Sequence, residues 1–361
     1  MNLIRDQFAP QVQCDTYASF TKKEEFSTQD FEQLMALSMD KGIPCLYKTT
    51  LWAQRASLQF GQEAQDFLDF ICNPGFDKYL SGEHINIKAL SKQQVDDELP
   101  IFTEAQELPL PEKRQLRCIY FVRRNKLIFN DINRTLSKTA LFCDNQPLFK
   151  PLCELVTCVT VRYQSYMQGL SVLCATCLLY SQSTQNGLAL ILKLTQTKIY
   201  LRFLSMNTEI LNTYSSQIYK TVLSLLKQKE FQGEFKFKFL MDEELLQQNI
   251  YPTMCGSAVG LVLSCFGKCG VKLAVKFVDI CCFGDQRAID LRFFQTLVAF
   301  YCAKFKKHYT PEFDVLLSEI TKQKEVTEAE AEEIVSIIKF IEGSQIVKNA
   351  LKTIEEVAKY V

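Results

Sequence analysis

Along most of the chain, apolar residues recur at every third or fourth position, the spacing that places side chains on one face of an α-helix. Phe31, Leu34 and Met39 follow this spacing in the stretch QDFEQLMALSMDK. Ser27 precedes the stretch as a helix-start signal, and Gly42 follows it as a stop signal. This pattern predicts the first helix of the protein.

The same signals predict helices through the rest of the chain. The predicted helices cover residues 47–60, 62–72, 111–125, 147–160, 166–182, 186–204, 208–229, 242–249, 255–266, 270–281, 288–306, 328–343 and 344–361. Residues 78–110 are mixed and polar, and we expect a long loop with short helical pieces there. Parallel strands with crossovers are not indicated, and no internal repeat appears, so the predicted fold class is all-α.

The C-terminal end has its own pattern. Thr327 and Glu330 form a capping-box pair in front of a helical stretch. The last predicted helix carries an apolar stripe on one face, formed by Ile346, Val347, Ala350, Leu351, Ile354, Val357 and Ala358. Three roles stay open for this end of the chain: packing on the preceding domain, dimerisation through the stripe, or recruitment of a partner.

Composition narrows the function classes. The 361-residue chain is 47% apolar with 27 Phe, enough for a large core. Its 41 basic and 41 acidic residues balance, which argues against a nucleic-acid-binding role. The 15 cysteines lie mostly in apolar runs and no secretory signal is evident, so we expect free thiols in a reducing cytosol. The cysteine pairs that begin at Cys174 and Cys281 lack further ligands, and His84 and His308 supply none nearby, so no metal site is predicted.

Two charge features bear on membranes. Residues 163–192 are uncharged, but polar residues interrupt them, and the apolar piece 169–180 is too short to cross a bilayer. We therefore expect buried core helices there. By contrast, residues 113–126 are strongly basic. They fit either a solvated helix face or a surface for an acidic partner or a phospholipid membrane.

Searches for familiar catalytic motifs fail. Gly260 and Gly267 enclose six residues, where a phosphate loop encloses four, and Cys269 follows Lys268 where Ser or Thr is needed. GxSxG and HExxH motifs do not occur. If the chain assists a reaction, we infer that another protein supplies the nucleotide or the metal.

Two polar stretches remain, IFNDINRT at 128–135 and YMQG at 166–169. Hydrolysis of a phosphoryl group needs a fixed positive charge and an amide that orients the attacking water, and Arg134 and Gln168 are such groups. Neither requires a shifted pKa. Taken alone, Arg134 with Asp131 also fits an ordinary ion pair, and Gln168 fits a solvated helix N-terminus.

In order and spacing, these stretches resemble the TBC-type Rab GTPase-activating domain family. Residues 128–135 match its IxxDxxRT motif, and residues 166–170 match its YxQGM motif with Leu170 in place of methionine. Gly42-Ile43-Pro44, followed by Lys48 and Trp52, is similar to its GIP…RxxxW opening.

Two later stretches, 249–266 and 277–279 (Phe-Val-Asp), are similar to further blocks of the family, and the resemblance covers roughly residues 28–310. It implies a two-lobed helical domain at 28–311, between an N-terminal segment (1–27) and a helical C-terminal extension (312–361). It also implies acceleration of GTP hydrolysis on a Rab-family GTPase in its GTP form. Magnesium and GTP would belong to that GTPase, and the chain would work in the cytoplasm, free or peripheral on endomembranes.

The resemblance also implies roles for the site residues. Arg134 would enter the partner's nucleotide site as an arginine finger, and Gln168 would position the water as a glutamine finger. Asp131 would orient Arg134, and Thr135 would cap the next helix. Tyr166 would pack behind the glutamine loop.

Three further positions support that site in the family. Gly169 would allow close backbone approach, and Trp52 would brace the catalytic loop from below. Lys48 stands where the family has arginine, and lysine cannot form a bidentate pair with a carboxylate such as Asp131. Lys48 and Trp52 also fit one surface and one core residue of a helix.

Other departures concern rate and partner choice more than fold. Ser171 stands where asparagine is common in the family, and residues 261–266 lack the family's tryptophan. Two rival functions stay open: a non-catalytic module that docks a GTPase or scaffold, and a structural or membrane-peripheral helical protein that uses residues 113–126.

Overall fold

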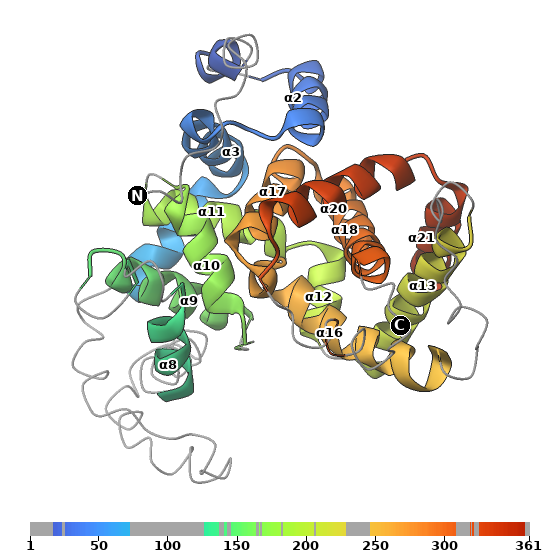
Figure 1. Ribbon diagram of the computed structural model, residues 1–361. Coiled ribbons are helices and arrows are strands. Elements are labelled where there is room, and N and C mark those ends of the chain that lie inside the picture. The colour runs from blue at the N-terminus through green and yellow to red at the C-terminus, as the bar shows by residue number, and fades with distance from the viewer. Residues whose placement is uncertain are drawn as a thin grey trace. The chain divides into compact units, whose positions relative to one another are not determined.

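The computed structural model describes residues 17–23, 26–72, 126–136, 141–142, 146–163, 166, 168–181, 183–205, 207–228, 246–307, 318, 320 and 325–357. Over these residues the protein is helical and contains no strand, which confirms the predicted all-α class. Figure 1 shows the described helices along the chain. The chain divides into two compact units. The first unit is formed by residues 1–55 and 193–361, and the second by residues 56–192.

The first unit holds most of the described helices. They are α2 (Thr28–Lys41), the start of α3 (Cys45–Ile71), the end of α11 (Thr184–Thr195), α12 (Lys198–Leu204), α13 (Thr208–Leu226), η6 (Leu246–Ile250), α16 (Tyr251–Leu263), η7 (Gly267–Cys269), α17 (Val271–Cys281), α18 (Gln286–Lys307), α20 (Glu328–Ile341) and α21 (Gln345–Val357). The second unit contains the rest of α3 and of α11, with α8 (Lys126–Arg134), α9 (Phe149–Tyr163) and α10 (Leu170–Leu179).

Side-chain caps begin two helices where the sequence predicts them. The hydroxyl of Ser27 accepts from the amide of Asp30, whose carboxylate accepts from the amide of Ser27. Thr327 and Glu330 form the same reciprocal pair at the start of α20. Each pair satisfies two donors that a helix start would otherwise leave open.

Two predicted boundaries are wrong. The helices predicted at 47–60 and 62–72 form one continuous helix, α3, because the apolar face continues past Gly61 through Phe60, Ala64 and Leu68. A glycine inside a helix costs only about 1 kcal/mol, less than the burial of this face contributes.

Conversely, the helix predicted at 186–204 is divided into α11 and α12. Thr197 separates them, because its side chain accepts from the amide of Tyr200 and starts a new helix. The predicted helix 111–125, the loop 78–110, His84, His308 and most of the basic stretch 113–126 lie outside the described residues.

An aromatic cluster forms the centre of the first unit. The ring centroids of Phe266 and Phe277 are 4.9 Å apart, and those of Phe277 and Phe293 are 4.6 Å apart. Tyr200 of α12 extends the cluster, with its ring 6.4 Å from Phe293. All four side chains are buried, so α12, α17 and α18 share one apolar core.

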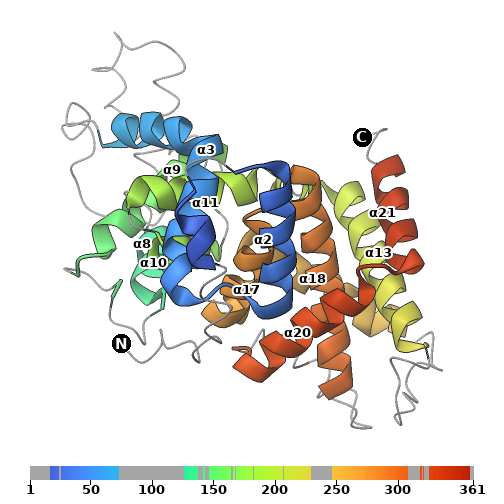
Figure 2. The ribbon, with the colours of Figure 1, turned by 90° about the horizontal axis from the view of Figure 1, so that it is seen from above.

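The C-terminal extension packs on the first unit. In both views α21 lies beside α13 and α20 lies across α18, and α20 also packs against α17 (Figure 2). Four ion pairs join α20 and the residue after it to α17 and α18: Lys276–Glu328, Lys304–Glu330, Lys306–Glu333 and Arg292–Glu342. Of the three roles considered for this end of the chain, the structure shows packing on the domain.

The cysteines whose side chains the structure describes are free thiols. Eleven are free, and eight of these are buried among apolar side chains. Burial raises the pKa of seven of these thiols, to about 12 for Cys269. Thiols held in this state are small core residues with little nucleophilic character.

Among the described residues, no helix is long and apolar enough to cross a membrane.

Ile338 tests how far the extension contributes to folding. Its side chain is buried in α20, so Ile338→Ala should lower the free energy of unfolding by about 2–5 kcal/mol. Glu332→Ala, on the exposed face of the same helix, should change it by no more than about 0.5 kcal/mol. Urea denaturation followed by circular dichroism measures both. Equal effects would mean that α20 does not contribute to the core.

Candidate functional site

The last turn of α8 presents an arginine beside a buried carboxylate. Asp131 and Arg134 lie one helical turn apart, and the guanidinium of Arg134 pairs with Oδ1 of Asp131. Asp131 is buried, whereas 63% of the Arg134 side chain is exposed. The expected orienting contact between these two residues is therefore present in the structure.

Tyr166 holds the other oxygen of the same carboxylate. Its hydroxyl donates to Oδ2 of Asp131 at 2.8 Å. Burial and the adjacent negative charge of Asp131 raise the pKa of Tyr166, so the phenol stays protonated and remains a donor. Tyr166 and Arg134 thus bind the two oxygens of one carboxylate, which restricts its rotation.

Thr135 connects this turn to α10. Its hydroxyl donates to the backbone carbonyl of Asp131 at 2.6 Å and shares a 2.8 Å hydrogen bond with the hydroxyl of Ser171. Residues 137–140 lie outside the described residues, so the expectation that Thr135 caps the next helix stays a prediction.

Gln168 stands just before the first turn of α10. It is exposed, and Gly169 after it is the N-cap residue with φ 104°. The carbonyl of Gly169 accepts from the amides of Val172 and Leu173. Because an L side chain rarely adopts such a φ, glycine is needed at 169 for the backbone turn itself.

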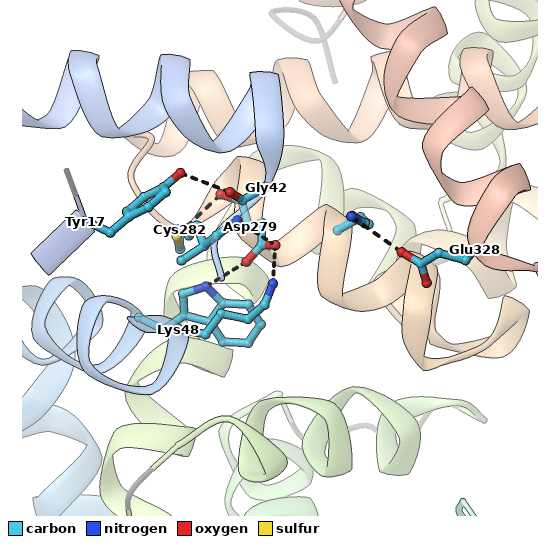
Figure 3. Close-up of polar contacts among 9 residues, drawn as sticks. Tyr17, Gly42, Lys48, Asp279, Cys282 and Glu328 are labelled. Atoms are coloured by element: carbon cyan, nitrogen blue, oxygen red, sulfur yellow. Dashed lines mark hydrogen bonds and ion pairs between the residues drawn. The ribbon is translucent and has the colours of Figure 1, made fainter. Parts of the chain in front are cut away.

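The first unit contains a second polar cluster, around Asp279 of α17 (Figure 3). The ammonium of Lys48 donates to Oδ2 of Asp279 at 2.7 Å, and the indole of Trp52 donates to Oδ1 at 3.1 Å. The amide of Ile43 adds a contact at 3.5 Å. Lys48 and Trp52 therefore both bind Asp279. The sequence analysis did not identify Asp279 as their partner.

Tyr17 and Gly42 complete this cluster. The phenol of Tyr17 donates to the carbonyl of Gly42 at 3.1 Å, as Figure 3 shows. Gly42 has φ 68° and ends α2, and its amide donates to the carbonyl of Ser38. The Gly42-Ile43-Pro44 turn is thus fixed by contacts on both sides.

A signal in the sequence points to Asp279. It is an acidic residue inside the otherwise apolar run FVDICCF, and a buried carboxylate requires donors. Burial raises the pKa of Asp279, and the charge and hydrogen bond of Lys48 act in the opposite direction. The sequence does not show which cation supplies the charge, because Lys48 is 231 residues away.

No protein-family model matches the sequence, and no curated protein matches it. The geometry of the two clusters therefore carries the functional argument. The Asp279 cluster is buried and offers no side chain to a ligand. The Asp131 cluster offers an oriented guanidinium at Arg134. Gln168 is exposed and stands two residues after Tyr166 along the chain.

Replacing Lys48 tests the Asp279 cluster. Lys48→Met leaves a buried carboxylate without its cation and should destabilise the protein by about 3–5 kcal/mol. Lys272→Met, at an exposed position on α17, should have little effect. Thermal unfolding of both variants beside the wild type measures the difference.

The stability of the Lys48→Met variant should depend on pH. Without Lys48, the pKa of Asp279 rises further, so the folded state binds a proton that the unfolded state releases. Stability then falls as pH rises through that window, and the deficit of Lys48→Met should be smaller at about pH 5 than at about pH 7.5. A deficit independent of pH would contradict the ion pair.

Proposed function

We propose that this protein is a TBC-type GTPase-activating protein that accelerates GTP hydrolysis by a Rab-family GTPase. The observation that carries the proposal is the way Arg134 is held. Its carboxylate partner, Asp131, is buried and is bound on its other oxygen by Tyr166. A solvated surface ion pair would need no such buried support and would contribute only about 0–1 kcal/mol.

The mechanism assigns one task to each finger. The GTPase brings GTP and magnesium, and Arg134 would place its guanidinium against the charge that develops on the γ-phosphate. Gln168 would hold the attacking water through its side-chain amide. An arginine supplied in trans accelerates hydrolysis about 10³–10⁵-fold, which corresponds to about 4–7 kcal/mol of transition-state stabilisation.

The resemblance supplies the architecture and setting of this proposal. The domain would be the two-lobed helical fold of the family, and the division of the chain into two compact units supports this. The protein would need no cofactor of its own. It would meet the GTP form of its Rab in the cytoplasm, on the surface of an endomembrane.

A second candidate is a module that binds a Rab without stimulating it. Two departures from the family motifs favour this alternative, Lys48 in place of arginine and Ser171 in place of asparagine. Both residues are buried and bonded within the fold. The two candidates differ in turnover and agree in binding.

Arg134→Ala distinguishes them. In single-turnover hydrolysis across a panel of GTP-loaded Rab proteins, wild-type protein should accelerate at least one, and the variant should lose about 10³-fold or more of that acceleration. Arg162→Ala, which removes an exposed arginine paired with Glu63, should retain it.

Binding to a GTP-locked Rab should survive the combined Arg134→Ala and Gln168→Ala substitutions. Full activity of Arg134→Ala would disprove the arginine-finger role. Binding without stimulation on any Rab of the panel would favour the non-catalytic module.

A further inference from the structure

We propose that Thr135 and Ser171 are positioning residues that lock the two fingers to each other. The inference rests on the proposed function and extends it to two buried side chains. Neither hydroxyl is accessible to a GTPase, since Thr135 and Ser171 are 3% and 2% exposed. Any effect on turnover must therefore pass through Arg134 or Gln168.

Each finger is enclosed in sequence by two members of one hydrogen-bonded cluster. Asp131 and Thr135 stand on either side of Arg134, and Tyr166 and Ser171 stand on either side of Gln168. The cluster joins them pairwise: Tyr166 binds Asp131 at 2.8 Å, and Thr135 binds Ser171 at 2.8 Å.

Two bonds restrict motion more than one. With only the Tyr166–Asp131 bond, the segment that carries Gln168 could still rotate about that contact. The Thr135–Ser171 bond is a second point of attachment at the first turn of α10. Together they fix the position of residue 168 relative to α8.

Asp131 is shared by both attachments. Its carboxylate binds Arg134 and Tyr166, while its backbone carbonyl accepts from Thr135, which in turn binds Ser171. A shift of α8 therefore reaches both fingers, and a shift of α10 is resisted through the same residue. Because a misplacement of about 1 Å can cost roughly 10²-fold in rate, this coupling matters for turnover.

The hydrogen bond between the hydroxyls of Thr135 and Ser171 is favoured by their burial. A buried hydroxyl without a partner is unfavourable, so each hydroxyl stabilises the other in a site that excludes water. Threonine and valine are close in shape, so Thr135→Val removes the hydroxyl, with its bonds to Ser171 and to the carbonyl of Asp131, and changes the packing little. Thr135→Ser keeps the hydroxyl and serves as the conservative control.

The test is single-turnover hydrolysis at saturating protein, with Ser171→Ala, Thr135→Val, their combination and Thr135→Ser. The first three should lower the saturated rate by roughly ten- to a hundredfold, and the half-saturating concentration should stay the same. The combined variant should be no worse than either alone, and Thr135→Ser should retain most of the rate.

A glutamine-free background makes the test specific. In Gln168→Ala protein, Ser171→Ala should lower the residual rate by a clearly smaller factor than in wild type, because only Arg134 remains to be positioned. An equal loss in both backgrounds, or an effect on half-saturation alone, would overturn the positioning role.

Hydrogen exchange separates this inference from the proposed function. In the free protein, amides of residues 168–173 should exchange faster in Ser171→Ala and Thr135→Val than in Thr135→Ser. Unchanged exchange would show that the bond does not hold the segment and would overturn the inference. A second outcome is faster exchange in the variants while the wild-type protein stimulates no Rab. The Thr135–Ser171 bond would then hold the segment 168–173, but the proposed function and the positioning role would both be wrong.

Discussion

Asp279 imposes a strict constraint on the first unit, because a fully buried carboxylate is tolerated only when donors surround it. Lys48, Trp52 and Ile43 supply those donors, and all three belong to the segment that enters and begins α3. This one side chain thereby fixes the Gly42-Ile43-Pro44 turn against α17. Since α17 also packs on α2, α18 and α20, the N-terminal helices and the C-terminal extension depend on the same helix.

Two carboxylates in this protein share one chemistry and differ in purpose. Asp279 and Asp131 each bind a cation and an aromatic donor. The two sites differ in how exposed the bound cation is. The Lys48 side chain is 4% exposed, whereas that of Arg134 is 63% exposed. A buried cation completes a fold, and an exposed cation with buried support is available to a second molecule.

Sequence reasoning succeeded where the determining interactions are local. The helix start at Ser27 and the capping box of Thr327 and Glu330 each involve residues within three positions, and the expected contact of Asp131 with Arg134 spans three residues. It failed where distant residues decide. Continuous burial of one face carried α3 past Gly61, and the partners of Lys48 and Thr135 come from chain segments that only folding brings together. The family assignment itself stays a prediction, resting on motifs whose geometry the structure describes.

The buried cysteines give the protein internal reporters of its own opening. Cys174 and Cys177 lie within the second unit, and Cys281, Cys282 and Cys302 lie within the first. Because their thiols react only when the surrounding helices separate, alkylation rates measure the opening of each unit independently. The two sets therefore register whether the units open in one cooperative step or in succession, without any added label.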